Sequence, residues 1–295
     1  MTAAIVDPAD ADSLAGVAAA AADGSVVPIL VGNERVIREI AEAGGIDLNG
    51  FEIVPVARPR EAVAEAIRLA REGRVEGIMK GTLPTEELIV PVVSSSKGLR
   101  TERRVSHVHV MDVPTYPKPL FITDSMINIL PGLSEKRDIC QNVIDLAHWL
   151  GIPAPKVAVL AAVETINPKM PTTIEAATLC KMAERGQIAG GILDGPLTFD
   201  HAVSLRAAEN TGIRSAVAGQ ADVLLVPDLE SGNMIAKQLM YLADALSAGI
   251  VLGARVPIAL TSRGDDRRSW LASATLVQLV AHMYRQQAAG ARGGH

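Results

Sequence analysis

The chain has 295 residues, 48% of them hydrophobic, and a formal net charge of −5 at pH 7. This length is enough for one large core or two linked ones, the apolar content excludes a disordered chain, and the lack of an extended basic run disfavours a nucleic-acid-binding surface. The N-terminal segment is acidic where a signal peptide is basic, and no apolar run approaches the roughly 18 residues of a membrane span, so we expect a cytoplasmic protein.

Short apolar segments rich in Val and Ile recur along the chain and predict β-strands. Their hydrophobicity is continuous, which is typical of strands covered on both faces in a mostly parallel sheet. The segment 104–111 differs, because its apolar and polar residues alternate, and it predicts an edge or antiparallel strand. The other predicted strands cover 26–32, 51–56, 77–81, 119–124, 157–163, 190–196, 221–227 and 256–262.

Longer segments between these strands carry apolar residues at spacings of three and four, which predicts helices. They include 59–73, 134–151 and 172–187. Asp7 followed by Pro, and Thr172 with Glu175 three residues later, are typical of helix starts, and Gly73 and Gly151 are typical of helix ends. Alternating strands and helices predict an α/β fold with mostly parallel sheets.

Polar residues follow six of the predicted strands, at the carboxyl ends where parallel α/β sheets bind ligands. One such residue alone is more often a helix cap, but six groups in one chain predict a polar cleft. The residues are Lys80, Gly81, Thr82, Asp124, Glu164, Asp194, Asp228, Ser262, Arg263 and Asp265.

The residue types in this predicted cleft are typical of an anion held beside a proton transfer. Arg263 offers a planar fork that fits phosphate oxygens, Ser262 adds a neutral donor, and Asp265 is a candidate base. Asn233 and Lys237 are four residues apart in a predicted helix and share one face, so they can reach one ligand together. A solvated polar helix face is the competing interpretation of this pair.

Several other chemistries lack their motifs in this sequence. It contains no phosphate-binding P-loop, no strand-linked G-x-G-x-x-G, no G-x-S-x-G and no H-E-x-x-H or C-x-x-C group, which disfavours ATP hydrolysis, Rossmann-type dehydrogenation and zinc catalysis. We expect Cys140 and Cys180 to be small hydrophobic residues within helices. His107 and His109 alternate onto one face of their strand, either as a weak metal or acid/base site or as a structural pair.

Six segments taken together resemble the phosphate acetyltransferase and phosphate butyryltransferase family. The patterns D-G-P-x-x-x-D, P-D-x-x-x-G-N-x-x-x-K and S-R-G are specific in combination and weak singly. The resemblance extends from about residue 77 to residue 281. The segments are KGTLPTEEL (80–88), PLFITDSMINILP (119–131), VAVLAAVETINPKMPTT (157–173), GGILDGPLTFDHAVS (190–204), AGQADVLLVPDLESGNMIAKQL (218–239) and VPIALTSRGDD (256–266).

The resemblance implies a fold like that of the isocitrate and isopropylmalate dehydrogenases, with two α/β domains and an inter-domain cleft. Residues 1–128 and 256–295 would form the first domain, and 129–255 the second. The family is usually dimeric, so the resemblance also implies a homodimer.

The family moves an acyl group between coenzyme A and inorganic phosphate, by direct reaction in a ternary complex and with no metal or cofactor required. The resemblance implies that Arg263 holds phosphate, that Ser262 donates to the developing oxyanion and that a nearby aspartate deprotonates the thiol of coenzyme A. Lys80, Gly81, Thr82, Asp124, Glu164, Asp194, Asn233 and Lys237 would contact the substrates.

The position of the base separates two branches of the family. Acetyl-type members resemble one another in placing an aspartate seven residues beyond the serine, where this chain has Ser269. Butyryl-type members have S-R-x-D, which Asp265 matches, so we assign the base to Asp265 with Asp266 as the competitor. This match favours acyl chains longer than acetyl, although the length itself stays open.

Two other functions fit the same architecture. A metal- and NAD-dependent β-decarboxylating oxidoreductase would use Asp124, Asp194 and Asp228 as metal ligands. A non-catalytic sensor of coenzyme A or acyl phosphate would keep the anion contacts and dispense with the base, which the presence of Asp265 disfavours.

Overall fold

The computed structural model describes residues 1–261 and 267–292. The chain forms two compact units, of which one combines Met1–Val105 with Ala248–His295 and the other is Ser106–Ser247. Both boundaries lie earlier in the chain than the 128/129 and 255/256 divisions that the resemblance implies. The reason is strand pairing, because the strands within 106–123 form part of the sheet of the second unit.

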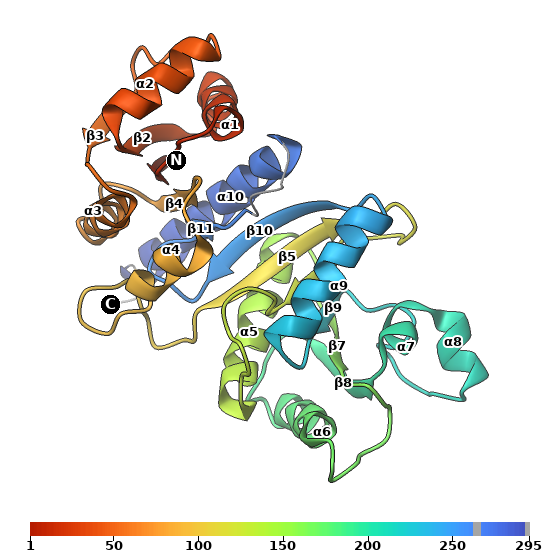
Figure 1. The fold of residues 1–295 in the computed structure, drawn as a ribbon. Helices are drawn as coiled ribbons and strands as arrows, with labels where there is room; N and C mark the ends of the chain where they lie inside the picture. The colour runs from red at the N-terminus through yellow and green to blue at the C-terminus, as the bar shows by residue number, and fades with distance from the viewer. Residues whose placement is uncertain (262–266, 293–295) are drawn as a thin grey trace. The chain divides into compact units, whose positions relative to one another are not determined.

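The first unit is built on a sheet of order β3-β2-β1-β4-β11-β10, shown in Figure 1. Neighbouring strands are parallel except β10 and β11, which are antiparallel. β10 contributes its residues from Ala248 onward. The strands are β1 (Thr2–Val6), β2 (Val27–Gly32), β3 (Glu52–Pro55), β4 (Gly77–Lys80), β10 (Leu246–Leu252) and β11 (Ile258–Ala259).

Helices cover both faces of this sheet. α1 packs closely on α10, since a Cβ added at Gly16 would lie 2.7 Å from the ring of Trp270. α3 and α4 lie together on the other face (Figure 1). The helices are α1 (Ala11–Ala22), α2 (Glu34–Ala43), α3 (Pro59–Arg71), α4 (Thr85–Val92) and α10 (Arg267–Arg292).

The expected helix start at Asp7 is wrong. Asp7 follows β1 and has a φ of 53°, and α1 begins later, where the side chain of Asp10 accepts a 2.8 Å hydrogen bond from the backbone N–H of Ser13. The strand β1 and the alanine-rich α1 were not predicted, because neither carries a strong pattern. The end of α3 is confirmed, with Gly73 at a φ of 72° directly after it.

The second unit has a sheet of order β5-β6-β9-β7-β8. β5 and β6 are antiparallel, which confirms the interpretation of the alternating segment 104–111, and the other pairs are parallel. The buried side chains of Ile122, Leu160 and Leu224 contribute to its core. The strands are β5 (Ser106–Asp112), β6 (Leu120–Thr123), β7 (Lys156–Leu160), β8 (Ile192–Leu197) and β9 (Val223–Leu225).

Three helices of this unit, α5, α6 and α9, correspond to predicted helices with one correction, whereas α7 and α8 were not predicted. α6 begins at Pro171 with Met170 at the cap, so the expected capping pair of Thr172 and Glu175 is wrong. The carboxylate of Glu175 instead accepts a 2.5 Å contact from the amine of Lys136 on α5. The helices are α5 (Leu133–Trp149), α6 (Pro171–Glu184), α7 (Phe199–Val203), α8 (Leu205–Asn210) and α9 (Leu229–Leu242).

Within residues 1–261 and 267–292, no helix is both long enough and apolar enough to cross a bilayer. The longest, α10, carries polar residues throughout its length.

Candidate functional site

The carboxyl ends of β1 and β4 form the first group of polar residues. The two strands are parallel neighbours, with Val6 opposite Lys80, so the residues after them meet at one edge of the sheet. Lys80 is 3% exposed, and its amine donates to the carbonyl oxygens of Gly81 at 3.0 Å and Leu83 at 3.3 Å. This buried amine is therefore held by main-chain carbonyl oxygens at this edge of the sheet.

Gly81 allows the backbones after the two strands to touch. A Cβ built there would lie 2.2 Å from the carbonyl oxygen of Asp7, a distance that no side chain tolerates. The next residue, Thr82, donates its backbone N–H to that same carbonyl at 3.0 Å. Its hydroxyl lies 3.1 Å from the carbonyl and 2.9 Å from the carboxylate of Asp7.

Asp7 therefore belongs to this group, although it was not predicted as a site residue. The signal was present, since Asp7 directly follows the apolar run TAAIV, as the predicted site residues follow their strands. The Asp-Pro pair instead favours a helix start at this position. Its left-handed φ turns the chain sharply at the end of β1 and directs its carbonyl toward Gly81 and Thr82.

The residues that lead up to the S-R-G-D-D segment lie at the same sheet edge. β11 is parallel to β4, with Ile258 opposite Ile78 and Ala259 opposite Met79. The chain then runs through Leu260 to Thr261, which is 7% exposed. The predicted catalytic residues Ser262, Arg263 and Asp265, and the competitor Asp266, lie outside the described residues.

In the second unit, Asp124 organises the turn after β6. One carboxylate oxygen accepts hydrogen bonds from the backbone N–H groups of Met126 at 2.9 Å and Ile127 at 3.1 Å. The other accepts from the backbone and side-chain nitrogens of Asn128, at 3.3 and 2.6 Å. Burial raises the pKa of this carboxyl above its usual range, against the lowering effect of these hydrogen bonds.

Helix α9 brings Asn233 to this turn. Asp228 caps the helix by accepting from the N–H of Ser231 at 2.8 Å. The close approach of α9 to the turn after β6 depends on Gly232, where an added Cβ would lie 3.1 Å from the Cβ of Ser125. The side-chain amide of Asn233 donates to the Ser125 carbonyl at 3.4 Å.

Lys237 lies one helical turn beyond Asn233 on α9, and both side chains are half-buried. The amine of Lys237 is 5.7 Å from the centre of the Tyr241 ring. Its positive charge also reaches β5, since it contributes to lowering the pKa of His109. The pair is therefore part of the partly buried face of α9.

His107 and His109 share one face of β5, as the alternation predicted, and their rings meet edge to face at 4.4 Å. Both are buried, and His109 forms a 2.8 Å hydrogen bond with the hydroxyl of Ser247. Burial, with a smaller effect from Lys237, lowers the pKa of His109 to about 3. Among the described residues, no three His, Cys, Asp or Glu side chains form a group that could hold a metal ion.

Glu164 and Asp194 lie apart from the Asp124 turn. Glu164 is exposed in the segment after β7, and β8, which carries Asp194, is separated from β6 by β9 and β7 in the sheet. Asp194 lies inside β8, opposite Ala158 of β7, and accepts from the N–H of the following residue at 2.9 Å.

The two cysteines are thiols in largely apolar surroundings. Cys140 on α5 is fully buried, and burial raises the pKa of its thiol. Cys180 on α6 is partly buried, and burial together with the charge of Asp194 raises its pKa to about 12. Both thiols are therefore protonated at neutral pH, which fits the expectation of small hydrophobic residues.

The comparisons with known proteins agree on one family. A family model described as "Phosphate acetyl/butaryl transferase" matches residues 57–277. The chain is 55% identical to a phosphate acetyltransferase of Rhizobium meliloti, over 94% of this chain and 88% of that protein. It is 42% identical to a phosphate butyryltransferase of Clostridium acetobutylicum, over 88% and 86% of the two chains.

Solved structures show the same fold. A branched-chain phosphotransacylase from Enterococcus faecalis V583 aligns with a TM-score of 0.82 and 27% identity, over 96% of this chain and 99% of that chain. A β-decarboxylating dehydrogenase from Thermococcus kodakarensis aligns with a TM-score of 0.52 and 12% identity, over 97% and 84%. The second similarity concerns the fold alone.

Proposed function

Because this chain belongs to the phosphate acetyl/butyryltransferase family, we propose that it moves a short acyl group, from acetyl to butyryl, between coenzyme A and inorganic phosphate in a direct ternary-complex reaction. The chain is a phosphate acyltransferase. The observation that carries this conclusion is the match over residues 57–277, which includes all of the predicted site residues. The oxidoreductase alternative is not favoured, since its support is a likeness of fold.

The proposed reaction needs one base and a set of anion contacts. In the direction of thioester synthesis, the base takes the thiol proton of coenzyme A and the thiolate forms a bond to the carbonyl carbon of the acyl phosphate. The carbon–oxygen bond to phosphate then breaks, and phosphate leaves with the bonding electrons. Electrons and atoms balance with no oxidant, so we propose that no cofactor is required.

We assign the proton transfer and the charge stabilisation to the segment after β11. Asp265 is the proposed base, Arg263 the phosphate ligand and Ser262 the donor to the oxyanion. Support comes from residue chemistry and from the pairing of β11 with β4, which brings the described residues before Ser262 to the edge that carries Lys80. The amine of Lys80 is a hydrogen-bond donor at that edge, which suits an anionic ligand.

The turn of Gly81 and Thr82 shapes the same edge in this proposal. The Thr82 hydroxyl has two acceptors on Asp7, so its first role is to hold the turn, and contact with substrate is secondary. In the second unit, the carboxylate of Asp124 is occupied by four N–H donors and acts through the shape of its turn. Asn233 and Lys237 are the proposed substrate contacts there, and Glu164 and Asp194 have the weakest support.

Acyl length is proposed from two observations that point in different directions. The S-R-x-D pattern favours chains longer than acetyl, whereas the 55% identity with an acetyltransferase exceeds the 42% identity with a butyryltransferase. We give the second observation more weight, since it draws on the whole chain, and propose acetyl as the better substrate. The homodimer and the cytoplasmic location remain predictions of the sequence.

The test is phosphate-dependent release of free coenzyme A from acetyl-, propionyl- and butyryl-coenzyme A. We expect release with all three, fastest with acetyl, and no change when a chelator is added. Reduction of NAD that depends on a divalent cation, without release of coenzyme A, would establish the oxidoreductase instead. Release with butyryl faster than with acetyl would restore the preference that Asp265 suggested.

A further inference from the structure

A cavity of about 750 Å³ opens in the first unit between α3 and the segment after α4. Its size lies within the range of about 300–1,000 Å³ that is usual for small-molecule sites. Its lining is partly apolar and partly charged, with three cations and one carboxylate. The lining residues are Ala64, Ile67, Arg68, Arg71, Glu72, Pro91, Ser94 and Lys97. The cavity thus combines a surface for a flat apolar body with cations beside it.

The wall that carries Lys97 is fixed by a tight turn. After α4, the N–H of Gly98 donates to the Ser94 carbonyl at 3.1 Å, and the N–H of Leu99 donates to the Val92 carbonyl at 2.8 Å. An added Cβ at Gly98 would lie 2.2 Å from the Val92 carbonyl oxygen, so glycine is required there. The backbone around Lys97 is therefore held in place before any ligand arrives.

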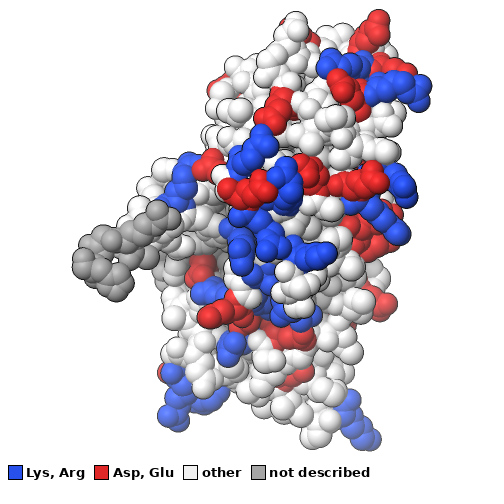
Figure 2. Space-filling model, turned by 90° about the vertical axis from the view of Figure 1, so that its left-hand side faces the viewer, with Lys and Arg blue, Asp and Glu red and all other residues white. Residues whose placement is uncertain are grey.

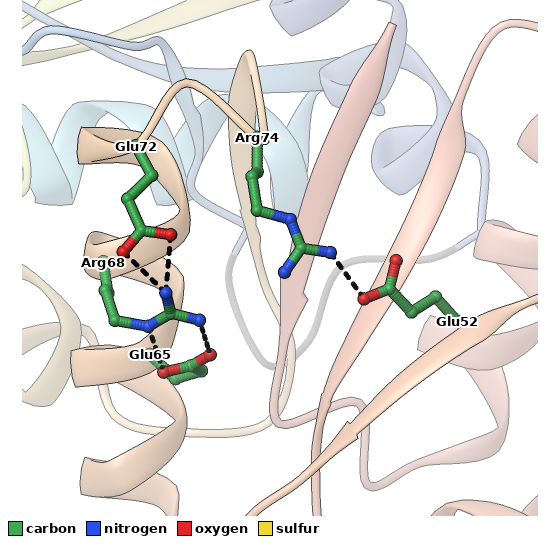
Figure 3. A network of polar contacts seen from close by, with 5 residues as sticks. All are labelled: Glu52, Glu65, Arg68, Glu72 and Arg74. Atoms are coloured by element: carbon green, nitrogen blue, oxygen red, sulfur yellow. Dashed lines mark hydrogen bonds and ion pairs between the residues drawn. The ribbon is translucent and has the colours of Figure 1, made fainter.

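Arg68 is locked by two carboxylates, as Figure 3 shows. Its guanidinium donates to Glu65 at 2.9 and 2.6 Å and to Glu72 at 2.6 and 2.5 Å. These contacts engage the edges of the planar group, and the two carboxylates outweigh its single positive charge. The flat faces remain as a stacking surface, which is the second way in which arginine binds ligands.

The free positive charge of the cavity comes from Arg71 and Lys97. Neither side chain has a hydrogen-bond or ion-pair partner among the described residues. The neighbouring Arg74 is engaged, since it donates to Glu52 at 2.7 Å (Figure 3). Figure 2 views the side on which α3 lies in Figure 1 and shows Lys and Arg side chains gathered there, with Asp and Glu side chains among them.

The cavity faces away from the polar edge described above. β3 and β4 run in the same direction within the sheet, so α3 returns the chain to the edge at which β4 begins. Arg68 and Arg71 lie in the last turn of α3 and are therefore near that starting edge. Lys80 lies at the other end of β4, so the cavity and the polar edge lie at opposite ends of that strand.

We propose that this cavity is a second ligand site, which binds a small phosphate monoester with a flat aromatic body. The aromatic ring lies on Ala64, Ile67 and Pro91 and stacks on the locked guanidinium of Arg68. The phosphate pairs with Arg71 and Lys97, two cations from separate elements that suit a doubly charged group. The proposal is independent of the acyl-transfer reaction.

The experiment is a calorimetric titration of the full-length protein with 1-naphthyl phosphate. We expect one binding site, weakened at least about tenfold in the double variant Arg71→Ser/Lys97→Ser. Ala64→Phe fills part of the cavity without changing charge and is expected to weaken binding to a similar extent. We expect 1-naphthol and inorganic phosphate, the two parts of the probe, each to bind more weakly than 1-naphthyl phosphate.

Two variants serve as controls. Arg206→Ser removes an exposed arginine of α8 that also lacks a side-chain partner among the described residues, and Arg263→Ala removes the arginine proposed for the transfer reaction. Both are expected to keep the affinity of the wild type. No binding to the wild type, or equal binding to the double variant, overturns the proposal. Loss of binding in Arg263→Ala alone would place the probe in the transfer site and also overturn it.

Discussion

The carboxylate of Asp7 accepts a 2.9 Å hydrogen bond from the hydroxyl of Thr82, across 75 residues of sequence. The same hydroxyl and the backbone N–H of Thr82 also contact the Asp7 carbonyl. Three contacts between two residues fix the turn that follows β4 against the turn that follows β1. The geometry around Lys80 therefore depends on the side chain at position 82.

Thr82→Val should destabilise the protein and disturb this turn. The substitution keeps the shape of the side chain but removes the donor, which leaves acceptors of Asp7 without their partner, so we expect a loss of about 1–2 kcal/mol in the free energy of unfolding. We also expect a higher KM for phosphate. Urea unfolding and steady-state kinetics measure the two effects. Thr82→Ser keeps the hydroxyl and serves as the control, and equal behaviour of both variants would mean that the hydroxyl is unimportant.

Gly81→Ala should be more damaging than its size suggests. The added Cβ would lie 2.2 Å from a backbone oxygen of Asp7, so β1 and β4 must separate at their carboxyl ends, at a cost of about 1–3 kcal/mol or more. Thermal unfolding and activity should both decline. Gly290→Ala, at a helical position with nothing within 4 Å of the added Cβ, is the matched control and should be neutral or slightly stabilising.

Arg263→Ala should raise the KM for phosphate and lower kcat. Loss of a charge-assisted contact to phosphate is expected to cost about 2–5 kcal/mol in kcat/KM, because the charge of the ligand is left without its partner. The measurement is a phosphate titration at saturating acetyl-coenzyme A, with Arg206→Ala as the control. Phosphate kinetics like those of the wild type would remove Arg263 from the site.

Asp265→Asn should reduce kcat by about 10²–10⁴ while binding of coenzyme A is largely kept, which is the usual result of losing one general base. Asp266→Asn should do much less. Turnover and calorimetric binding of coenzyme A are compared for both variants. The reverse order would make Asp266 the base, and full activity in both would show that another group takes the thiol proton.

His109 should make stability depend on pH. Burial lowers its pKa to about 3 in the folded state, from 6.5 for an unperturbed histidine, so the unfolded chain binds an extra proton between these values. Stability is therefore lost as pH falls below about 6.5, by up to roughly 1.4 kcal/mol per pH unit. Urea unfolding at pH 7.5, 6.5 and 5.5 should show a weaker dependence in His109→Asn than in the wild type. The exposed His282→Asn is the control, and identical slopes in all three proteins would contradict the assignment.

Local patterns in the sequence determined much of the secondary structure. The Val- and Ile-rich segments became β2, β3, β4, β6, β7, β8, β9 and β11, and the periodic segments became α3, α5 and α6. The strands are apolar throughout and the helices bury one apolar face, so the spacing of their apolar residues can be recognised in the sequence. β1, β10 and the alanine-rich α1 carry weaker contrast between faces, and packing against their neighbours decides their structure.

Most candidate residues could be identified from the sequence because they follow predicted strands. The residues that they contact in the fold could not be identified in this way. Asp7 contacts Thr82 because their strands are neighbours and Gly81 lets the two backbones approach. Asn233 contacts the carbonyl of Ser125, 108 residues away, because Gly232 lets the helix approach that turn. Asp194 fits the same sequence rule as Asp124, yet it lies inside β8 beside Cys180. Sequence determines which residues stand near strand ends, whereas register and helix packing, which depend on contacts between distant segments, decide which of them share an edge.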